Sequence, residues 1–429
     1  MNALSSLARS CRGAAAFLGG PRSSFSPPVR RALQVDVSVT MFLTAFTALT
    51  TPFNGVILRR ELGASAFQLS VLASANAACL LLSLALARLV DSRHPLPYVV
   101  WPGFVARALF LLVPVIHSPW PFVAVIAFGT LLGTLSSPAQ TALVQQVYPR
   151  SERSRALGTV RVAGGIVGVG IGVVSGPLMG RFGYRPVLCG AALLGMMASL
   201  RQRKLPLPPE GETPVPARPG LRQAWAAMRD DRWYRRVLLG SFVFGSGIWI
   251  MTPATPLVLA DVLAVTPAQV GGLAAVAAVA ALGGNVLWAR LVNRHSSLAA
   301  LRVVYLVGIM TPLTYYVVQA LVPNPSFLAV TSISEALMAT GLDLVCTLVV
   351  LDFAGPRRAA QYAAISGTLA GVRGILGPLV GAAIIHCWGL QTVYLVAAAL
   401  MTSGAWLATR QVRHIARGRV DLVTQPAVG

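Results

Sequence analysis

Three ionisable side chains lie inside long apolar runs, where a charge is costly. Glu335 and Asp343 belong to the run 327–354, and Arg373 belongs to the run 359–386. If both runs are helices that cross a membrane, Glu335 lies about 13 Å and Arg373 about 21 Å from one end of its helix. Asp343 follows Glu335 by about 12 Å along the axis and about 80° around it. We therefore expect Glu335 and Arg373 near the middle of the bilayer.

Two interpretations of these charges are open. A single charge in a membrane interior is expensive, so it needs a partner or must be neutralised by protonation. In the first interpretation, Glu335 or Asp343 alternates between a neutral form and an ionised form held by Arg373, which would couple a proton gradient to movement of a solute. In the second, the charges form a static pair that fixes two helices.

The elements that must hold these residues are long apolar segments. Apolar residues make up 55% of the 429 residues, and charged residues make up 11%, well below the roughly 25% of soluble domains. Runs of about 18 residues with almost no charge can cross a hydrocarbon core as helices. We predict an all-α membrane protein with twelve transmembrane helices. The expected spans are 35–57, 66–90, 98–116, 120–147, 156–180, 186–200, 237–258, 267–292, 300–322, 327–354, 359–386 and 391–409, of which the sixth is the shortest.

The second half of the chain repeats the first at a shift of about two hundred residues. A repeat at a fixed distance is strong evidence for the architecture, and it predicts two six-helix pseudo-repeats. Arg373 stands where the first repeat has Gly172, which argues against packing as the reason for this arginine. The matching pairs are 87–94 with 289–295, Thr51-Pro52 with Thr252-Pro253, Leu62 and Gln68 with Leu263 and Gln269, and 176–180 with 377–381.

The repeat and the composition divide the chain into five parts. Long apolar runs occupy the two halves, and the segment between them is rich in arginine and proline, which suits a linker that lets the halves move as bodies. The predicted parts are a disordered basic extension at 1–34, a six-helix bundle at 35–200, a linker at 201–236, a second six-helix bundle at 237–409 and a tail at 410–429.

The formal net charge of +22 does not indicate a nucleic-acid partner, because position explains it. Most of the 35 basic residues fall on one side of the predicted membrane, in the tails, the linker and every second connection. This asymmetry is the positive-inside bias and predicts that both termini are cytoplasmic. We expect a multi-pass protein of the plasma membrane, or of the inner membrane if the source is bacterial. Arg107, inside the third span, needs a partner or a water path, and a structural role is favoured for it.

Residues for soluble catalysis or metal binding are not arranged in any known pattern. The five histidines are dispersed, and no glycine-rich phosphate loop is followed by Lys-Ser or Lys-Thr. The five cysteines have neither disulfide nor metal spacing. We therefore expect neither an enzyme nor a cofactor.

Two motifs and their repeats carry a resemblance to a known family. The loop after the second span has Asp91 and Arg93, and its repeat has Asn293 and Arg294. In the fifth span, residues 172–180 read Gly-Val-Val-Ser-Gly-Pro-Leu-Met-Gly, with a partial repeat at Gly377-Pro378. Together with the two six-helix halves, these features resemble the major facilitator superfamily over about residues 35–409. In that family the loops latch the halves on the cytoplasmic side, and the partial match of both copies, with Asn293 in place of the acid, implies a weakened latch here. Gly172, Gly176, Pro177 and Gly180 are similar to a motif of the family's antiporter branch.

The resemblance also implies that the first, fourth, seventh and tenth helices line a central cavity. The candidates there are Asn54, Gln140, Trp249, Thr252 and Glu335, which could orient a solute through hydrogen bonds and an aromatic face. We expect a monomeric secondary transporter that exports a small organic solute in exchange for protons and contacts membrane lipids. The alternatives are proton-coupled or facilitative uptake by the same fold, or a non-transporting receptor or assembly protein that kept it.

Overall fold

A computed structural model describes residues 25–86, 95–206, 232–321 and 324–423. These residues form helices and short connections, with no strand among them. The predicted loop residues Asp91 and Arg93 lie outside the described residues, as do residues 1–24 of the extension and residues 207–231 of the linker.

The first half contains six helical segments in the described residues. Gly63 and Gly183 have positive φ values of 70° and 77°, which only glycine adopts easily, and they allow the reversals after the first and fifth segments. The segments are α2 (Pro27–Arg60), α3 (Ala66–Leu86), α4 (Pro95–Ala108) continued by η2 (Leu109–Val115), α5 (Pro119–Val147), α6 (Arg150–Phe182) and α7 (Tyr184–Gln202). Helix α2 begins eight residues before the predicted span.

The second half repeats this plan, and side chains cap the starts of α11 and α12. Thr266 and Gln269 form a capping box at the start of α11, which satisfies backbone N–H groups that the helix leaves free. The elements are α9 (Arg232–Met251), α10 (Ala254–Leu257), η3 (Val258–Val262), α11 (Pro267–Arg294), α12 (Ser297–Ala320), η4 (Pro325–Phe327), α13 (Leu328–Trp388) and α14 (Leu390–Val423). Helix α14 continues past the predicted end at residue 409.

Helix α13 contains the predicted tenth and eleventh spans. The ring of Tyr234 lies 5.9 Å from that of Phe353 and 4.3 Å from that of Tyr362, and its hydroxyl donates to the Tyr362 carbonyl at 3.0 Å. Asp343 and Arg373 line one cavity, although thirty residues of straight helix would separate them by about 45 Å. The two parts of α13 therefore fold back beside each other.

The described helices meet the requirements for membrane spans almost everywhere. Nine segments are long and apolar enough to cross a bilayer, and shorter apolar segments occur in α3 and α5. Helix α7 is 19 residues long but is not among them, and it corresponds to the predicted sixth span. The all-helical membrane fold is confirmed, and the membrane crossings of α3, α5 and α7 are the part of the twelve-helix count that stays a prediction.

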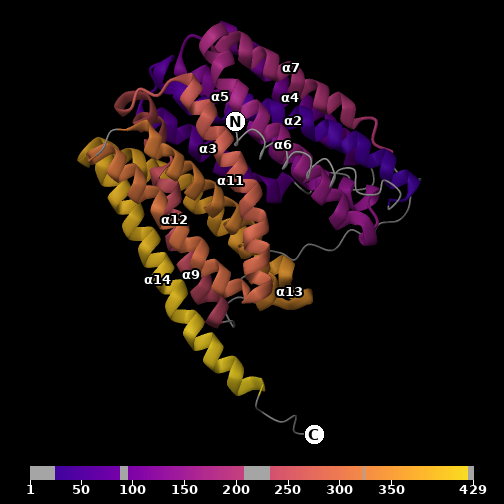
Figure 1. Cartoon of the computed structure of the whole chain (residues 1–429), viewed down its shortest axis with the longest axis vertical. Coiled ribbons are helices and arrows are strands. Elements are labelled where there is room, and N and C mark those ends of the chain that lie inside the picture. Colours follow the sequence, from indigo (N-terminus) through magenta and orange to yellow (C-terminus); the bar gives the residue numbers. More distant parts are fainter. Residues whose placement is uncertain (1–24, 87–94, 207–231, 322–323, 424–429) are drawn as a thin grey trace, which may run out of the picture.

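The two halves lie side by side (Figure 1), with α2–α7 in indigo to magenta and α9–α14 in rose to yellow. Helix α6 packs along α11, and α3 packs along α13. We name the two ends of the molecule by α2: the Arg59 end, where α2 ends and α11 begins, and the Pro27 end, where α2 begins and α11 ends.

Candidate functional site

Three cavities lie along the helices that carry the predicted site residues. One of about 780 Å³ lies within the first half, bounded by α2, α4, α5 and α7. A second of about 230 Å³ lies within the second half, between α9 and the two parts of α13. A third of about 390 Å³ lies between the halves, where α2 faces α9, α10 and α13.

Glu335 lines the cavity between the halves. It shares this cavity with Thr51 of α2 and with Thr252 and Thr255 of the second half. The stacked rings of Tyr315 and Tyr394, with centroids 5.1 Å apart, lie close enough to interact electrostatically with the Glu335 carboxyl. Glu335 is half-buried, so this acid lies where both halves and the solvent in the cavity can influence its charge.

Arg373 and Asp343 share the cavity of the second half and not that of Glu335. The Arg373 Nη1 donates to the Ser241 carbonyl at 2.5 Å, and Ser241 also accepts a bond of 2.7 Å from the Tyr305 hydroxyl. Among the described residues, no ion pair joins Arg373 to Glu335 or to Asp343. The structure therefore brings Asp343 and Arg373 to one cavity and separates Glu335 from both.

Asn54 and Gln140 both line the large cavity of the first half. Gln140 accepts a hydrogen bond of 2.8 Å from the Gln202 amide. The Asn54 Oδ1 is buried and accepts no hydrogen bond from the described residues. Arg107 lines the same cavity and donates to the Ser199 hydroxyl at 2.6 Å.

Trp249 and Thr252 lie on α9 and just after it, but they face different neighbours. Thr252 lines the cavity between the halves. Trp249 packs against Gly374 and Gly377 of α13: a methyl group at Gly377 would lie 2.6 Å from the Trp249 Cβ. Trp249 is not among the residues that line the three cavities, and it supports the α9–α13 contact in this conformation.

The glycines of α6 allow the close approach of the two halves. A methyl group at Gly172 would lie 2.9 Å from the Ala275 nitrogen, and one at Gly176 would lie 2.5 Å from the Ala268 Cα. Both neighbours belong to α11 of the other half. Gly180 has open space around it, and Pro177 lies within α6, which remains helical through it.

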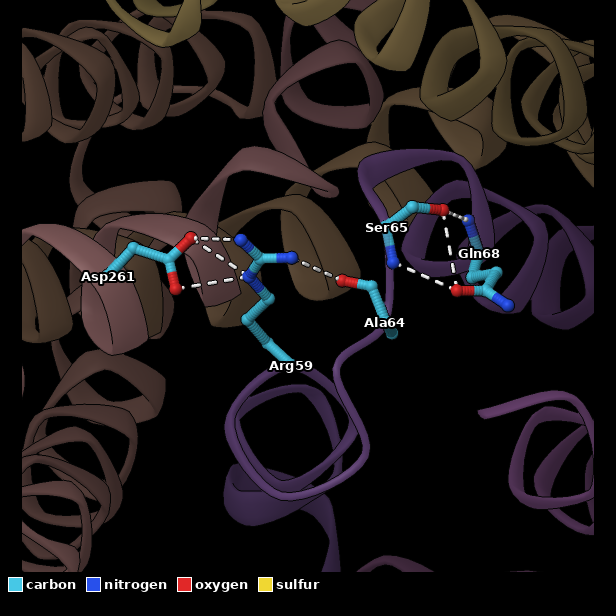
Figure 2. A network of polar contacts seen from close by, with 5 residues as sticks. All are labelled: Arg59, Ala64, Ser65, Gln68 and Asp261. Carbon is cyan, nitrogen blue, oxygen red and sulfur yellow. Dashed lines mark hydrogen bonds and ion pairs between the residues drawn. The ribbon is translucent and has the colours of Figure 1, made fainter. Parts of the chain in front are cut away.

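A polar network joins the halves at the Arg59 end (Figure 2). The Arg59 guanidinium forms an ion pair of 2.8 Å with Asp261 of η3 and donates to the Ala64 carbonyl at 2.7 Å. Arg60 donates to the Val265 carbonyl at 2.8 Å. At the Pro27 end, Asn293 and Arg294 lie in the last turn of α11, and their predicted counterparts Asp91 and Arg93 lie outside the described residues.

Sequence reasoning missed two features of these sites. The first is the Arg59–Asp261 pair, whose partners are 202 residues apart; the signal available was that both charges flank equivalent connections of the two repeats. The second is the pair of tyrosines beside Glu335, which lie on α12 and α14 and have no spacing that relates them to an acid on α13.

Two bundles of six helical segments, with cavities inside and between them, are the architecture of a class of membrane transporters built from two helical halves. The sequence profile described as Major Facilitator Superfamily matches residues 37–334 and 237–421. The chain therefore belongs to the major facilitator superfamily, as its sequence resemblance predicted. A comparison with curated protein sequences gives no match.

Three solved structures with the same fold are described as transporters. A bacterial homologue of the human lysosomal transporter Spinster, inward-facing and unoccupied, is 15% identical, with a TM-score of 0.66 over 90% of this chain and 98% of that chain. Its inward-facing and occupied form aligns with a TM-score of 0.65 and 15% identity, over 91% and 98% of the two chains. The nucleoside transporter NupG is 13% identical, with a TM-score of 0.69 over 89% and 99%. At these identities the likeness concerns the fold.

Proposed function

We propose that this chain is a secondary active transporter that exports a small organic solute in exchange for protons. The observation that carries the proposal is the position of Glu335 in the cavity between the halves, beside Thr51 and Thr252. An acid whose surroundings change when two halves rock about a cavity binds its proton differently in the two conformations. Proton binding is then linked to the direction in which the cavity opens.

The export direction is supported by the Gly172–Gly180 segment, which is similar to the antiporter motif and faces α11 across the two halves. Basic residues concentrate at the Pro27 end, so the positive-inside bias supports a cytoplasmic Pro27 end and cytoplasmic termini in a plasma membrane. In that orientation the Arg59–Asp261 network closes the outer side.

The test uses the full chain in proteoliposomes with an imposed pH gradient. The probes are radiolabelled succinate, glucose 6-phosphate, an amino acid, a nucleoside and a quaternary ammonium ion. We expect at least one flux that responds to the gradient, and we expect Glu335→Gln to remove the response because glutamine cannot exchange a proton. Glu61→Gln is the matched control, since Glu61 is an exposed acid at the end of α2.

Three results separate the alternatives. Movement of solute in the same direction as the protons would indicate proton-coupled uptake. Equal fluxes with and without the gradient would indicate facilitated diffusion. Absence of any flux, together with a fixed conformation in the distance measurements described below, would favour a non-transporting protein.

A further inference from the structure

The cavity of the first half is the largest of the three, at about 780 Å³, and it contains an arginine that the proton-coupling proposal does not use. Arg107 lies twelve residues after the start of α4, about 18 Å from the Pro27 end of that helix. A charge at this depth in a membrane helix marks a functional site by default, and its partner needs to be identified.

The fold provides space for this side chain. A methyl group at Gly103 would lie 2.5 Å from the Arg107 Nη1, and one at Gly195 of α7 would lie 2.6 Å from its Cδ. The guanidinium therefore passes between two glycines to reach Ser199, to which Nη1 donates at 2.6 Å. A guanidinium has five N–H donors, so this one bond leaves the others available to a ligand in the cavity.

The charges around the cavity do not compensate Arg107. The other charged residues that line it are Asp36 and Arg153. Asp36 accepts a bond of 3.0 Å from Tyr148 at the Pro27 end, and Arg153 donates to the Tyr148 carbonyl at 2.9 Å. Phe46 adjoins Gly195 on the same side as Arg107 and follows Asp36 by ten residues of α2, about 15 Å. Among the described residues, no acid interacts electrostatically with Arg107.

Neutral donors and acceptors lie one turn away. Gln202 follows Ser199 by three residues on α7, and its amide bonds to Gln140 across the cavity wall at 2.8 Å. The Phe46 and Phe110 rings, with centroids 5.2 Å apart in an edge-to-face arrangement, also line the cavity. Arg373, which lines the cavity of the second half, differs from Arg107 because its cavity also contains Asp343.

We propose that Arg107 is the anion-binding group of a solute site in this cavity, and that the transported solute carries a carboxylate or phosphate group. This rests on the proposed transport function. Carboxylates and phosphates match the planar guanidinium with two parallel N–H···O bonds. Ser199 orients the guanidinium, and the glutamine pair supplies hydrogen bonds to the rest of the solute.

The test compares binding of matched charged and neutral compounds to the purified full chain in detergent. The pairs are succinate with succinamide and glucose 6-phosphate with glucose, and inorganic phosphate is the minimal anion. Binding is read as the rise in Tm with ligand concentration, because a ligand specific for the folded state stabilises it. We expect at least one anion to raise Tm where its neutral partner does not, and the two pairs distinguish a carboxylate from a phosphate.

The variants assign the effect to Arg107. We expect Arg107→Ala to weaken anion binding by about tenfold or more, Arg107→Lys to weaken it less because the charge remains, and Ser199→Ala to weaken it a few-fold. Arg161→Ala, which removes an exposed arginine of α6 outside the three cavities, is the matched control and is expected to bind like the wild type. If Arg107→Ala does not fold, Arg107→Lys and Ser199→Ala decide the assignment.

The proposal is overturned if every anion and its neutral partner change Tm equally, or if the Arg107 variants bind anions like the wild type. Its failure is distinguishable from failure of the transport proposal. Flux of a neutral or cationic probe without anion binding would retain transport and reject the anion site. Anion binding that depends on Arg107 without any flux would retain the site and reject transport.

Discussion

At the scale of single residues, position relative to the cavities separates groups that look alike in the sequence. Glu335 and Asp343 are both acids of α13, but Glu335 lines the cavity between the halves, whereas Asp343 and Arg373 line the cavity within the second half. Glu335 is therefore the better candidate for proton exchange during rocking. Asp343 with Arg373 suits the static interpretation better, because the cavity that they share lies within one half.

The place of Arg373 depends on a glycine. A methyl group at Gly245 of α9 would meet the Arg373 guanidinium, with 2.6 Å to Nε. We predict that Gly245→Ala lowers the apparent Tm, because overpacking costs about 1–3 kcal/mol and disturbs the bond from Arg373 to the Ser241 carbonyl. Thermal unfolding in detergent measures this. Gly272→Ala in α11, where a methyl group meets no atom within 4 Å, is expected to leave Tm unchanged or to raise it.

At the scale of elements, the contact between α6 and α11 depends on backbone approach. At Gly176 the added methyl group would meet the backbone of Ala268, whereas at Gly180, one turn later on the same helix, it would meet nothing within 4 Å. We predict that Gly176→Ala pushes the helices apart and reduces transport several-fold, while Gly180→Ala has no effect. Flux in proteoliposomes measures this, and equal fluxes for the two variants would contradict a role of this contact.

The Arg59–Asp261 pair is an element-scale contact because it joins the end of α2 to η3. Its side chains are 32% and 42% exposed, so the pair contributes at most about 1 kcal/mol, or about a fivefold change in a conformational equilibrium. Spin labels at Glu61→Cys and Val262→Cys, in a variant without native cysteines, measure the distance across this contact. We predict that Asp261→Asn broadens the distribution of this distance toward longer values.

A charge exchange tests whether the pair itself is responsible. The double change Arg59→Asp with Asp261→Arg is expected to restore the short distance, while either change alone is not. Asp352→Asn, which affects an acid that accepts a hydrogen bond from Ser297, serves as the control. If the distance is the same in all these variants, other contacts hold the Arg59 end closed.

At the scale of the whole molecule, the two halves contact each other unevenly along their length. Between α6 and α11, close approaches occur at Gly176, Gly172 and Gly165, but Gly158, two turns further toward the Pro27 end, has open space around it. Polar contacts also join the two halves at the Arg59 end. The conformation described here is therefore closed at the Arg59 end.

Alternating access predicts that the two ends move in opposite directions. Spin labels at Gly158→Cys and Val286→Cys report the Pro27 end, and the pair at residues 61 and 262 reports the Arg59 end. We predict that conditions that lengthen the distance at the Arg59 end shorten the distance at the Pro27 end. Simultaneous lengthening of both distances would indicate loosening of the structure and would contradict rocking of rigid halves.

The sequence by itself determined the helical membrane fold, the two halves and the family. A bilayer accepts helices of about twenty apolar residues, so composition along the chain reveals them, and the repeat at a shift of about two hundred residues relates them in two sets. The Gly172–Gly180 segment and the intramembrane charges were visible for the same reason. Each is an exception within an apolar run.

Only the tertiary structure decided which of these residues meet. The rotation of each helix about its axis and the fold-back of α13 separate Glu335 from Arg373 and bring Asp343 to it, and no spacing in the sequence contains that information. The Arg59–Asp261 pair and the cavity around Arg107 likewise depend on helices distant along the chain. Apolar length is a property of a segment, whereas a cavity is a property of the packing among several segments.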